Sequence, residues 1–208
     1  MAINVEYNNR EITQMVIENT FKMLENRNII KSWETEYNKI TKEDFQNKNV
    51  FELPDNKISI YLLNMKLSSI SQGHPLDVFL SNNINTHKII IVKDVAKKVF
   101  KQVIIEYKNA EIFFEYEMMI DRANIIFVPK HEIINAEEKK ELLSKFNEID
   151  LKHILLYDAM SRYHGAKIGD IFKITIPSST SGYNIDYRRV VNGSLDICLL
   201  YTSDAADE

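Results

Sequence analysis

The stretch that decides the fold is residues 158–191, DAMSRYHGAKIGDIFKITIPSSTSGYNIDYRRVV. Its first residue, an aspartate, is suited to cap a short helix, and Gly165 lies where such a helix would end with a left-handed residue. The residues over 171–176 and 184–191 then predict two strands, joined by the serine- and glycine-rich turn 178–182. This dense patterning contains no set of catalytic residues. We therefore interpret the stretch as a docking module.

The composition is that of an ordinary globular protein, with 45% hydrophobic and 27% charged residues. A length of 208 residues allows one large or two small domains. The net charge of −4 and the pI of 5.8 argue against a protein that binds nucleic acid by itself, because such domains are usually strongly basic. The N-terminus lacks the apolar core of a signal peptide, so we expect a soluble, intracellular chain without a membrane partner.

Residues 198–208, CLLYTSDAADE, resemble a translated sequencing adapter, and we expect the natural sequence to end near Ile197. We leave this segment out of the fold prediction. It contains Cys198, the single cysteine. The sequence therefore predicts neither a disulfide framework nor thiolate chemistry.

Helices and strands alternate over residues 1–128. The predicted elements are a helix over 9–26 capped by Asn9, a helix opening at 41–44, a turn over 52–56, a strand over 58–63, a helix over 75–80, a strand over 87–92, a helix over 95–107 capped by Asp94, and strands over 111–115 and 125–128. The isoleucine-rich strand 87–92 is apolar enough to be buried on both faces. This order predicts an α/β domain whose mixed sheet is flanked by helices.

Pro129 marks the predicted boundary to a small α+β domain over residues 129–197. Its predicted elements are a helix opening at Asn135 with Leu142, Leu143 and Phe146 on its apolar side, a strand over 153–156, the helix capped by Asp158, and the paired strands over 171–176 and 184–191.

The sequence contains few signs of chemistry. The five histidines have no metal-ligand spacing and no cysteine partners, so we expect no metal site and no cofactor. Gly165-x-Lys167-x-Gly169 is followed by a strand rather than a helix, and we interpret it as a turn rather than a phosphate-binding loop.

A metal-dependent nuclease of restriction-endonuclease-like fold is the alternative function. Pro54-Asp55 and Asn64-Met65-Lys66 surround the strand 58–63 in the manner of the Pro-Asp…(Asp/Glu)-x-Lys pattern. Asn64 stands where that pattern needs a second carboxylate to hold the metal. A neutral amide is a weaker ligand, so we expect no enzyme activity.

Lysines follow the outer face of the helix over 95–107. They could form the solvated face of an amphipathic helix or approach a phosphate backbone without sequence specificity, and the sequence leaves both readings open. The DNA-proximal candidates are Lys93, Lys97, Lys98 and Lys101. A free-standing DNA-binding factor is a further possibility, which the acidic pI disfavours.

A longer ordered motif surrounds the opening stretch. Its parts are Val128-Pro129-x-His131, Leu142-Leu143, Leu151-x-x-Ile154, Asp158, Arg162-Tyr163-x-Gly165, Lys167-x-Gly169, Lys173-Ile174, Ser178-x-Thr180-x-Gly182 and Tyr187-Arg188. This order resembles the assembly domain of the fifth subunit shared by the eukaryotic nuclear RNA polymerases, a domain to which an archaeal polymerase subunit corresponds. Ala159, Ile168 and Ile176 depart from the proline, basic residue and arginine that are usual in the family.

Before residue 125 the order of elements is similar to the family's N-terminal jaw domain, which the archaeal counterpart lacks. The resemblance therefore implies a eukaryotic or viral protein, in the nucleus or, if viral, in the virion and host cytoplasm. It implies a non-catalytic subunit of a multisubunit DNA-directed RNA polymerase. Residues 129–197 would dock on the largest subunit, beside other polymerase subunits, and residues 1–128 would reach towards downstream duplex DNA.

The motif also supplies candidate subunit-interface residues. They are His131, Ile154, Asp158, Arg162, Tyr163, Gly165, Lys167, Gly169, Lys173, Thr180, Gly182, Tyr187 and Arg188. Turns at Gly165, Gly169 and Gly182 would suit a preorganised docking surface, because a rigid surface loses little entropy on assembly.

Overall fold

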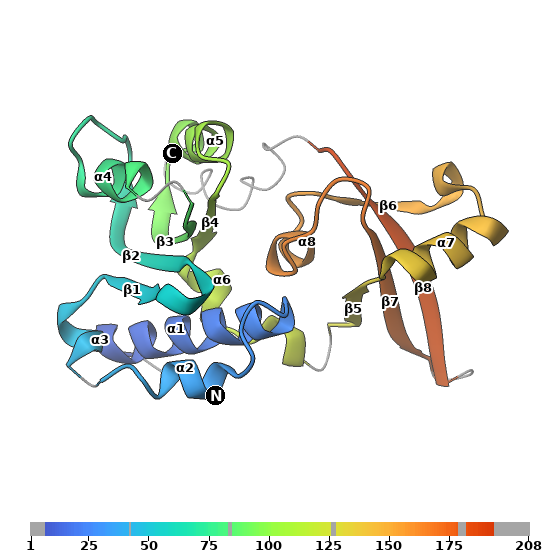
Figure 1. The fold of residues 1–208 in the computed structure, drawn as a ribbon, viewed down its shortest axis with the longest axis horizontal. Helices are drawn as coiled ribbons and strands as arrows, with labels where there is room; N and C mark the ends of the chain where they lie inside the picture. Colours follow the sequence, from blue (N-terminus) through green and yellow to red (C-terminus); the bar gives the residue numbers. More distant parts are fainter. Residues whose placement is uncertain (1–6, 42, 83–84, 126–127, 179–181, 194–208) are drawn as a thin grey trace, which may run out of the picture. The chain divides into compact units, whose positions relative to one another are not determined.

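A computed structural model describes the chain except for residues 1–6, 42, 83–84, 126–127, 179–181 and 194–208 (Figure 1). The chain divides into two compact units, residues 1–120 and 121–208, called unit 1 and unit 2 below. The predicted boundary between residues 128 and 129 falls within unit 2. The predicted tail 198–208 and the centre of the predicted strand 125–128 lie outside the described residues.

Unit 1 contains one four-stranded mixed sheet with helices on both faces. Its helices are α1 (Asn9–Asn26), α2 (Trp33–Tyr37), α3 (Asp44–Asn47), α4 (Pro75–Ser81), α5 (Lys97–Glu106) and α6 (Glu115–Met118). Its strands are β1 (Val50–Leu53), β2 (Ile58–Leu67), β3 (His87–Val95) and β4 (Ala110–Phe114), in the order β1-β2-β3-β4. β1 is antiparallel to β2, whereas β2, β3 and β4 are parallel. No described helix is long and apolar enough to span a membrane.

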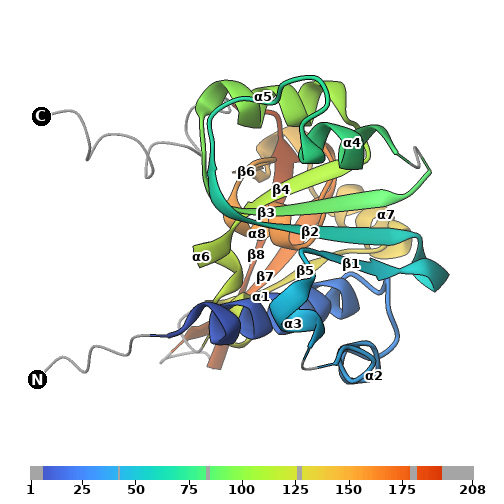
Figure 2. The same ribbon diagram turned by 90° about the vertical axis from the view of Figure 1, so that its left-hand side faces the viewer.

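The apolar centre of β3 explains this layered arrangement. Ile89, Ile90, Ile91 and Val92 are all buried, as the sequence predicts for a strand covered on both faces. Figure 2 shows α4 and α5 over one face of the sheet and α1, α2 and α3 over the other. Phe100 from α5 and Ile17 from α1 are fully buried.

The start of α1 differs from the prediction by one residue. Asn8, not Asn9, is the N-cap, because Asn8 keeps an extended backbone and its side chain accepts from the Glu11 amide at 2.9 Å. The Glu11 carboxylate accepts from the Asn8 amide at 2.9 Å in return, which completes a capping box.

The predicted helix start at Val95, with Asp94 as its cap, is wrong. β3 continues to Val95 because β2 pairs with it as far as Leu67. The Asp94 carboxylate accepts from the Val95 amide at 2.8 Å and lies 2.9 Å from Lys66 Nζ. α5 begins two residues later, at Lys97.

Two short elements before β2 also differ from the prediction. The predicted turn over 52–56 comprises the end of β1 and a 3₁₀ turn over Pro54–Asn56. The helix predicted to open at 41–44 is α3, which begins at Asp44, and it is preceded by α2, which the sequence pattern did not predict.

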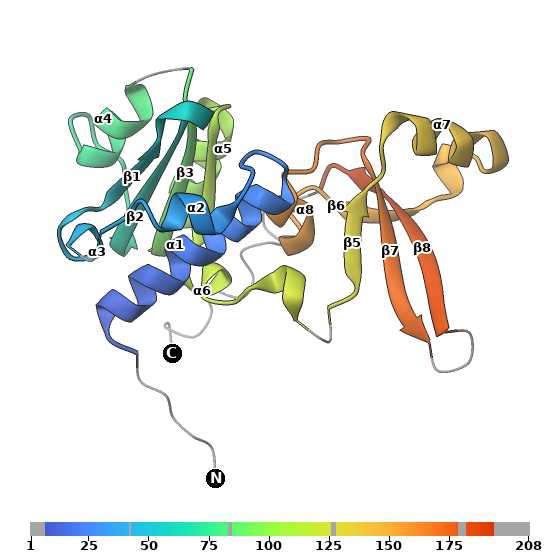
Figure 3. The ribbon, with the colours of Figure 1, turned by 60° about the horizontal axis from the view of Figure 1, so that its bottom comes forward.

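Unit 2 also has a mixed four-stranded sheet, in the order β5-β7-β8-β6 (Figure 3). The strands are β5 (Lys130–Ile133), β6 (Lys152–Leu155), β7 (Ile171–Ser178) and β8 (Gly182–Val191), and the α-helices are α7 (Ala136–Lys145) and α8 (Ala159–Tyr163). β7 is antiparallel to both β5 and β8, whereas β6 is parallel to β8. The predicted pairing of the last two strands is confirmed.

The sheet of unit 2 has a small core on each side. Phe172 and Ile174 pack with Ile154 and Val190 in one core, and Ile171 packs with Leu142 of α7 in the other. Phe146 was predicted on the apolar side of α7, but it is 57% exposed. It follows the last helical residue and has an extended backbone, so its side chain leaves the helix's buried face.

An ion cluster joins the end of α1 to the sheet of unit 1. Arg27 donates two hydrogen bonds to the Glu111 carboxylate, at 2.8 and 2.7 Å, and His87 Nε2 lies 2.8 Å from Glu111 Oε1. Burial alone would raise the pKa of Glu111, but the hydrogen bond from His87 and the charge of Arg27 outweigh it and lower the pKa from 4.5 to about 2.

The lowered pKa of Glu111 predicts that unit 1 loses stability in acid. A carboxyl with a folded pKa below its unfolded value stabilises the fold above pH 4.5, and this contribution is lost as the pH falls towards about 2. We expect a loss of about 3 kcal/mol in the free energy of unfolding as the pH falls through this window. Urea unfolding followed by the fluorescence of Trp33, the single tryptophan, measures it in unit 1.

Glu111→Gln is the matched control because an amide does not ionise in this window. The variant should be less stable than the parent at neutral pH, and its stability should depend less on pH below 4.5. An equal pH dependence in parent and variant would show that Glu111 does not contribute the effect.

Candidate docking site in unit 2

The α8 turn has the geometry that the sequence predicts. The Asp158 carboxylate accepts from the Met160 amide at 2.9 Å and caps α8. Gly165 follows the helix with a φ of 62° and donates its amide to the Arg162 carbonyl at 3.0 Å. Left-handed backbone suits glycine, since a Cβ there is close to the following carbonyl. Tyr163 is buried rather than presented to a partner.

A second turn, over residues 167–170, ties α7 to the end of β8. The Asp170 carboxylate accepts from the Lys167 amide at 2.7 Å. Gly169 has a φ of 90°, donates to the Val190 carbonyl at 2.9 Å and accepts from Lys139 Nζ at 2.7 Å. A Cβ on Gly169 would contact nothing within 4 Å, so backbone conformation, not space, favours glycine there.

A row of aromatic rings includes Phe172, which belongs to the core formed with Ile174, Ile154 and Val190. The ring of Phe172 is 5.9 Å from that of His131 and 5.6 Å from that of His164, both in edge-on geometry. The His164 ring is in turn 5.2 Å from Tyr163. The structure thus connects the predicted residues His131 and Tyr163 through Phe172 and His164, which the sequence motif did not single out. Their place in the row depends on long-range packing, for which the sequence contains no local signal.

The remaining candidates divide between core and surface. Ile154 is buried in the core that contains Phe172 and Ile174. Tyr187 is partly buried and packs against the other core, which contains Leu142 of α7. Lys173 Nζ lies 3.9 Å from a Glu138 oxygen, and Arg188 Nε donates to Asp186 at 3.0 Å. Gly182 opens β8 with a φ of 76°, whereas the predicted interface residue Thr180 lies outside the described residues.

Unit 2 exposes large apolar side chains that the sequence pattern did not place at a surface. Tyr183 and Ile185 of β8 are 71% and 49% exposed, on the part of the strand beyond its pairing with β6. Ile168, in the second turn, is 61% exposed. Tyr183 and Ile185 are two residues apart and so share one face of β8, and contiguous apolar surface is typical of surfaces that contact a partner. Alternation placed Tyr183 and Ile185 in or beside a strand, but it could not show which face remains uncovered.

The DNA-proximal candidates lie at the end of β3 and on the first turns of α5. Lys93, Lys97 and Lys98 are exposed, and Lys101 is half-buried. Burial raises the pKa of Glu115, and the nearby charge of Lys93 opposes this shift.

The nuclease pattern does not form a metal site in the part of the chain that the structure describes. Lys66 is paired with Asp94, and Asn64 is an exposed residue of β2. Among the described residues, no three histidine, cysteine or acidic side chains come together in a way that could hold a metal ion.

Each of the two units combines a mixed four-stranded sheet with helices, and unit 2 contains the capped turns and the paired strands of the sequence motif. Residues 122–190 match the family model for the RNA polymerase Rpb5 C-terminal domain. The chain is 31% identical to DNA-directed RNA polymerase subunit 5 of Acanthamoeba polyphaga mimivirus over 148 residues, 69% of this chain and 71% of the relative. It is 28% identical to the subunit rpabc1 of RNA polymerases I, II and III from Dictyostelium discoideum over 182 residues, 82% and 92% of the two chains.

An archaeal relative, subunit Rpo5 of the DNA-directed RNA polymerase from Nitrosopumilus maritimus, is 44% identical over 68 residues, 32% of this chain and 82% of its own. The chain belongs to the RNA polymerase subunit 5 family. The resemblance drawn from residues 128–188 is confirmed, and the comparisons give no support to the nuclease alternative.

The left-handed backbone at Gly165 predicts a graded response to substitution. Gly165→Val should lower the free energy of unfolding of unit 2 by about 1–2 kcal/mol, because a branched side chain is strained there. Gly165→Asn should cost less, since asparagine tolerates this conformation. Thermal unfolding followed by near-ultraviolet circular dichroism measures both changes. Equal effects of valine and asparagine would contradict the role given to the backbone.

Proposed function

We propose that the chain is a non-catalytic subunit of a multisubunit DNA-directed RNA polymerase. Unit 2 acts as its assembly domain and docks on the largest subunit. Unit 1 acts as a jaw that lies near downstream duplex DNA during transcription. The observation that carries the proposal is the Rpb5 C-terminal match over residues 122–190, together with relatives that are themselves named as polymerase subunits.

Rigid backbone in unit 2 supports a docking role. The turns at Gly165 and Gly169 are fixed by hydrogen bonds to Arg162 and Val190 before any partner binds. A surface that is ordered in advance loses little conformational entropy on association, so more of the interaction energy appears as affinity. Among the predicted interface residues, Lys167 is exposed and Arg188 and Lys173 are partly exposed. We assign direct contact with the partner to these three.

The exposed apolar residues extend the proposed interface. Tyr183 and Ile185 lie on the free part of β8, and burying such side chains supplies the apolar core that a stable subunit interface needs. Ile154 and Tyr163 are buried, so we assign them a supporting role in unit 2 rather than direct contact with the partner. Asp158 caps α8, and His131 packs its ring against Phe172.

The lysines of unit 1 support a weak approach to DNA. Lys97 and Lys98 occupy the first turn of α5, which contains no acidic residue, so their charges add to the positive end of the helix dipole. Contacts of this kind with phosphates carry no sequence information. The net charge of −4 is consistent with DNA being held mainly by other subunits. We also propose that the chain adds no active site of its own to the polymerase.

The relatives include both a cellular and a viral protein, from Dictyostelium discoideum and from mimivirus. We propose that the protein acts in the nucleus if it is cellular, or in the virion and host cytoplasm if it is viral.

The docking proposal predicts a stable complex with the cognate largest subunit. Co-expression followed by size-exclusion chromatography should show the two proteins in one peak, and Tyr183→Asp with Ile185→Asp should reduce the bound fraction at least tenfold by placing charges in an apolar interface. Phe146→Asp, an equally polar change at another exposed residue of unit 2, is the control for general instability. Separate elution of the two proteins, both folded, would contradict the docking proposal.

The DNA proposal predicts an effect of charge reversal in the assembled polymerase. Lys93→Glu, Lys97→Glu and Lys98→Glu together should weaken binding to duplex DNA for every sequence, and each lost phosphate contact should reduce the salt slope by about 1. Reversal of Lys31, Lys57 and Lys140, three other exposed lysines outside α5, is the matched control. Equal salt slopes of DNA binding in the two variants would show that Lys93, Lys97 and Lys98 do not contact DNA.

A further inference from the structure

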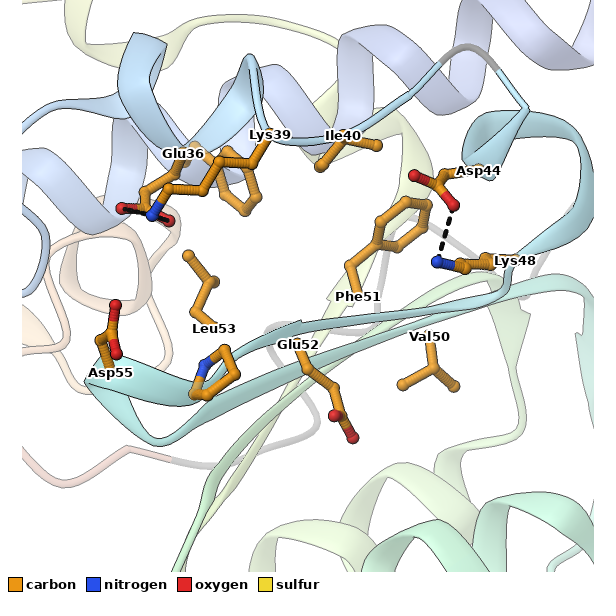
Figure 4. Close-up of a pocket in the computed structure, with 12 residues that line it drawn as sticks. Glu36, Lys39, Ile40, Asp44, Lys48, Val50, Phe51, Glu52, Leu53 and Asp55 are labelled. Carbon is orange, nitrogen blue, oxygen red and sulfur yellow. Dashed lines mark hydrogen bonds and ion pairs between the residues drawn. The ribbon is translucent and has the colours of Figure 1, made fainter.

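An open groove of about 450 Å³ runs along β1, the edge strand of unit 1 (Figure 4). All four residues of β1 line it, together with residues from the segment that joins α2 to α3 and with Asp55. Phe51 and Leu53 point towards the helices, whereas Val50 and Glu52 point to the other face of the strand (Figure 4). Because side chains from both faces border the same groove, the groove follows the outer edge of β1.

The backbone of β1 presents unpaired polar groups along that edge. The Leu62 amide donates to the Asn49 carbonyl at 2.8 Å, which fixes the alternation of the β1–β2 ladder. Phe51 therefore directs its N–H and C=O towards β2, and Val50 and Glu52 direct theirs away from it. Within the described residues, the backbone groups of Val50 and Glu52 have no hydrogen-bond partner.

The charges of the groove are unevenly paired. Lys39 is held by Glu36 at 2.8 Å, and Lys48 by Asp44 at 2.6 Å. Both pairs appear as dashed lines in Figure 4. Glu52 is exposed and has no ion-pair partner among the residues that the structure describes, and the same holds for Asp55. With the two lysines neutralised, these two carboxylates give the groove a net negative charge.

We propose that this groove binds an extended segment of another protein, which adds as a fifth strand to the free edge of β1 and places basic side chains opposite Glu52 and Asp55. Main-chain hydrogen bonds to Val50 and Glu52 would supply affinity, and alternate side chains would supply specificity. Apolar residues of the segment would face Ile40 and Phe51 on the helix side of the groove. The proposal concerns unit 1 alone and does not depend on the docking of unit 2.

Other occupants fit the groove less well. Pairing of two copies through β1 would bring two negative edges together, and like charges opposed across strands are destabilising. Nucleic acid would be repelled by the unpaired carboxylates. A purely protective role for Glu52 is the competing explanation, since charged residues at a sheet edge also prevent unwanted pairing.

A model peptide tests the proposal on the full chain. The probe is the blocked peptide Thr-Lys-Val-Lys-Val-Lys-Thr, titrated while amide hydrogen exchange is followed by nuclear magnetic resonance. We expect the peptide to slow exchange at Val50 and Glu52 and to leave Phe51 and Leu53, which already pair with β2, unchanged. Absence of protection at Val50 and Glu52 at millimolar peptide would overturn the proposal and leave the protective role.

Two modified peptides separate strand addition from simple charge attraction. One peptide carries N-methyl groups on its lysine amides and the other carries them on its valine amides. Because alternate amides of a strand face its neighbour, only one of the two peptides loses the amides that would donate to β1. Loss of two hydrogen bonds should weaken that peptide about tenfold or more, while the other retains its affinity. Equal affinity of both for the protein would contradict a strand-addition mode.

Charge reversal in the protein completes the test. Glu52→Lys should weaken the lysine peptide at least tenfold, and should improve binding of the matching peptide with glutamates in place of lysines. Glu106→Lys, an equal change at an exposed position in α5, should alter neither peptide's affinity. An equal loss in both variants would show that net charge, not the β1 groove, governs binding.

Discussion

The antiparallel pairing of β7 with β8 is the constraint on which unit 2 depends. β5 pairs with β7 and β6 pairs with β8, so the four-stranded sheet forms only if β7 and β8 pair with each other. The register that sets Phe172 opposite Arg188 places Phe172 and Ile174 in one core and Ile171 in the other. A slip of one residue would exchange the two faces and remove both cores. The Gly169 amide donates to the Val190 carbonyl and the Val190 amide donates to the Asp170 carbonyl, so backbone hydrogen bonds tie the start of β7 to the end of β8 in this register.

The sequence predicted those features that depend on neighbouring residues. Asp158 caps α8 and Gly165 follows it in left-handed backbone, because both effects act within one helical turn. The failures have long-range causes. Asp94 looks like a helix cap, but pairing of β2 with β3 as far as Val95 keeps it in a strand. Phe146 fits the apolar spacing of α7, yet the helix ends before it.

The candidate docking site was predictable in part for the same reason. A motif of ordered residues located the turns and the hairpin, and the family match over residues 122–190 agrees with it. It could not separate buried residues from exposed ones, since burial of Tyr163 and exposure of Ile168 follow from packing. The row formed by His131, Phe172 and His164 joins three elements that no local pattern connects. Sequence order therefore located the turns and the paired strands, and only packing showed which of their residues are buried.

The two free strand edges differ in a way that suits different kinds of partner. The open part of β8 carries Tyr183 and Ile185, and an uncovered apolar edge promotes aggregation, so it is compatible with a lasting subunit interface. The edge of β1 carries the exposed carboxylate of Glu52, and a charged residue on an edge strand prevents unwanted pairing when no partner is bound. A permanent contact through unit 2 would keep the apolar edge of β8 covered. An exchangeable contact through unit 1 would leave only the charged edge of β1 exposed to solvent. Under the two proposals, a lasting partner covers Tyr183 and Ile185 of the open β8 edge, whereas the edge of β1 is exposed between encounters and is protected by Glu52.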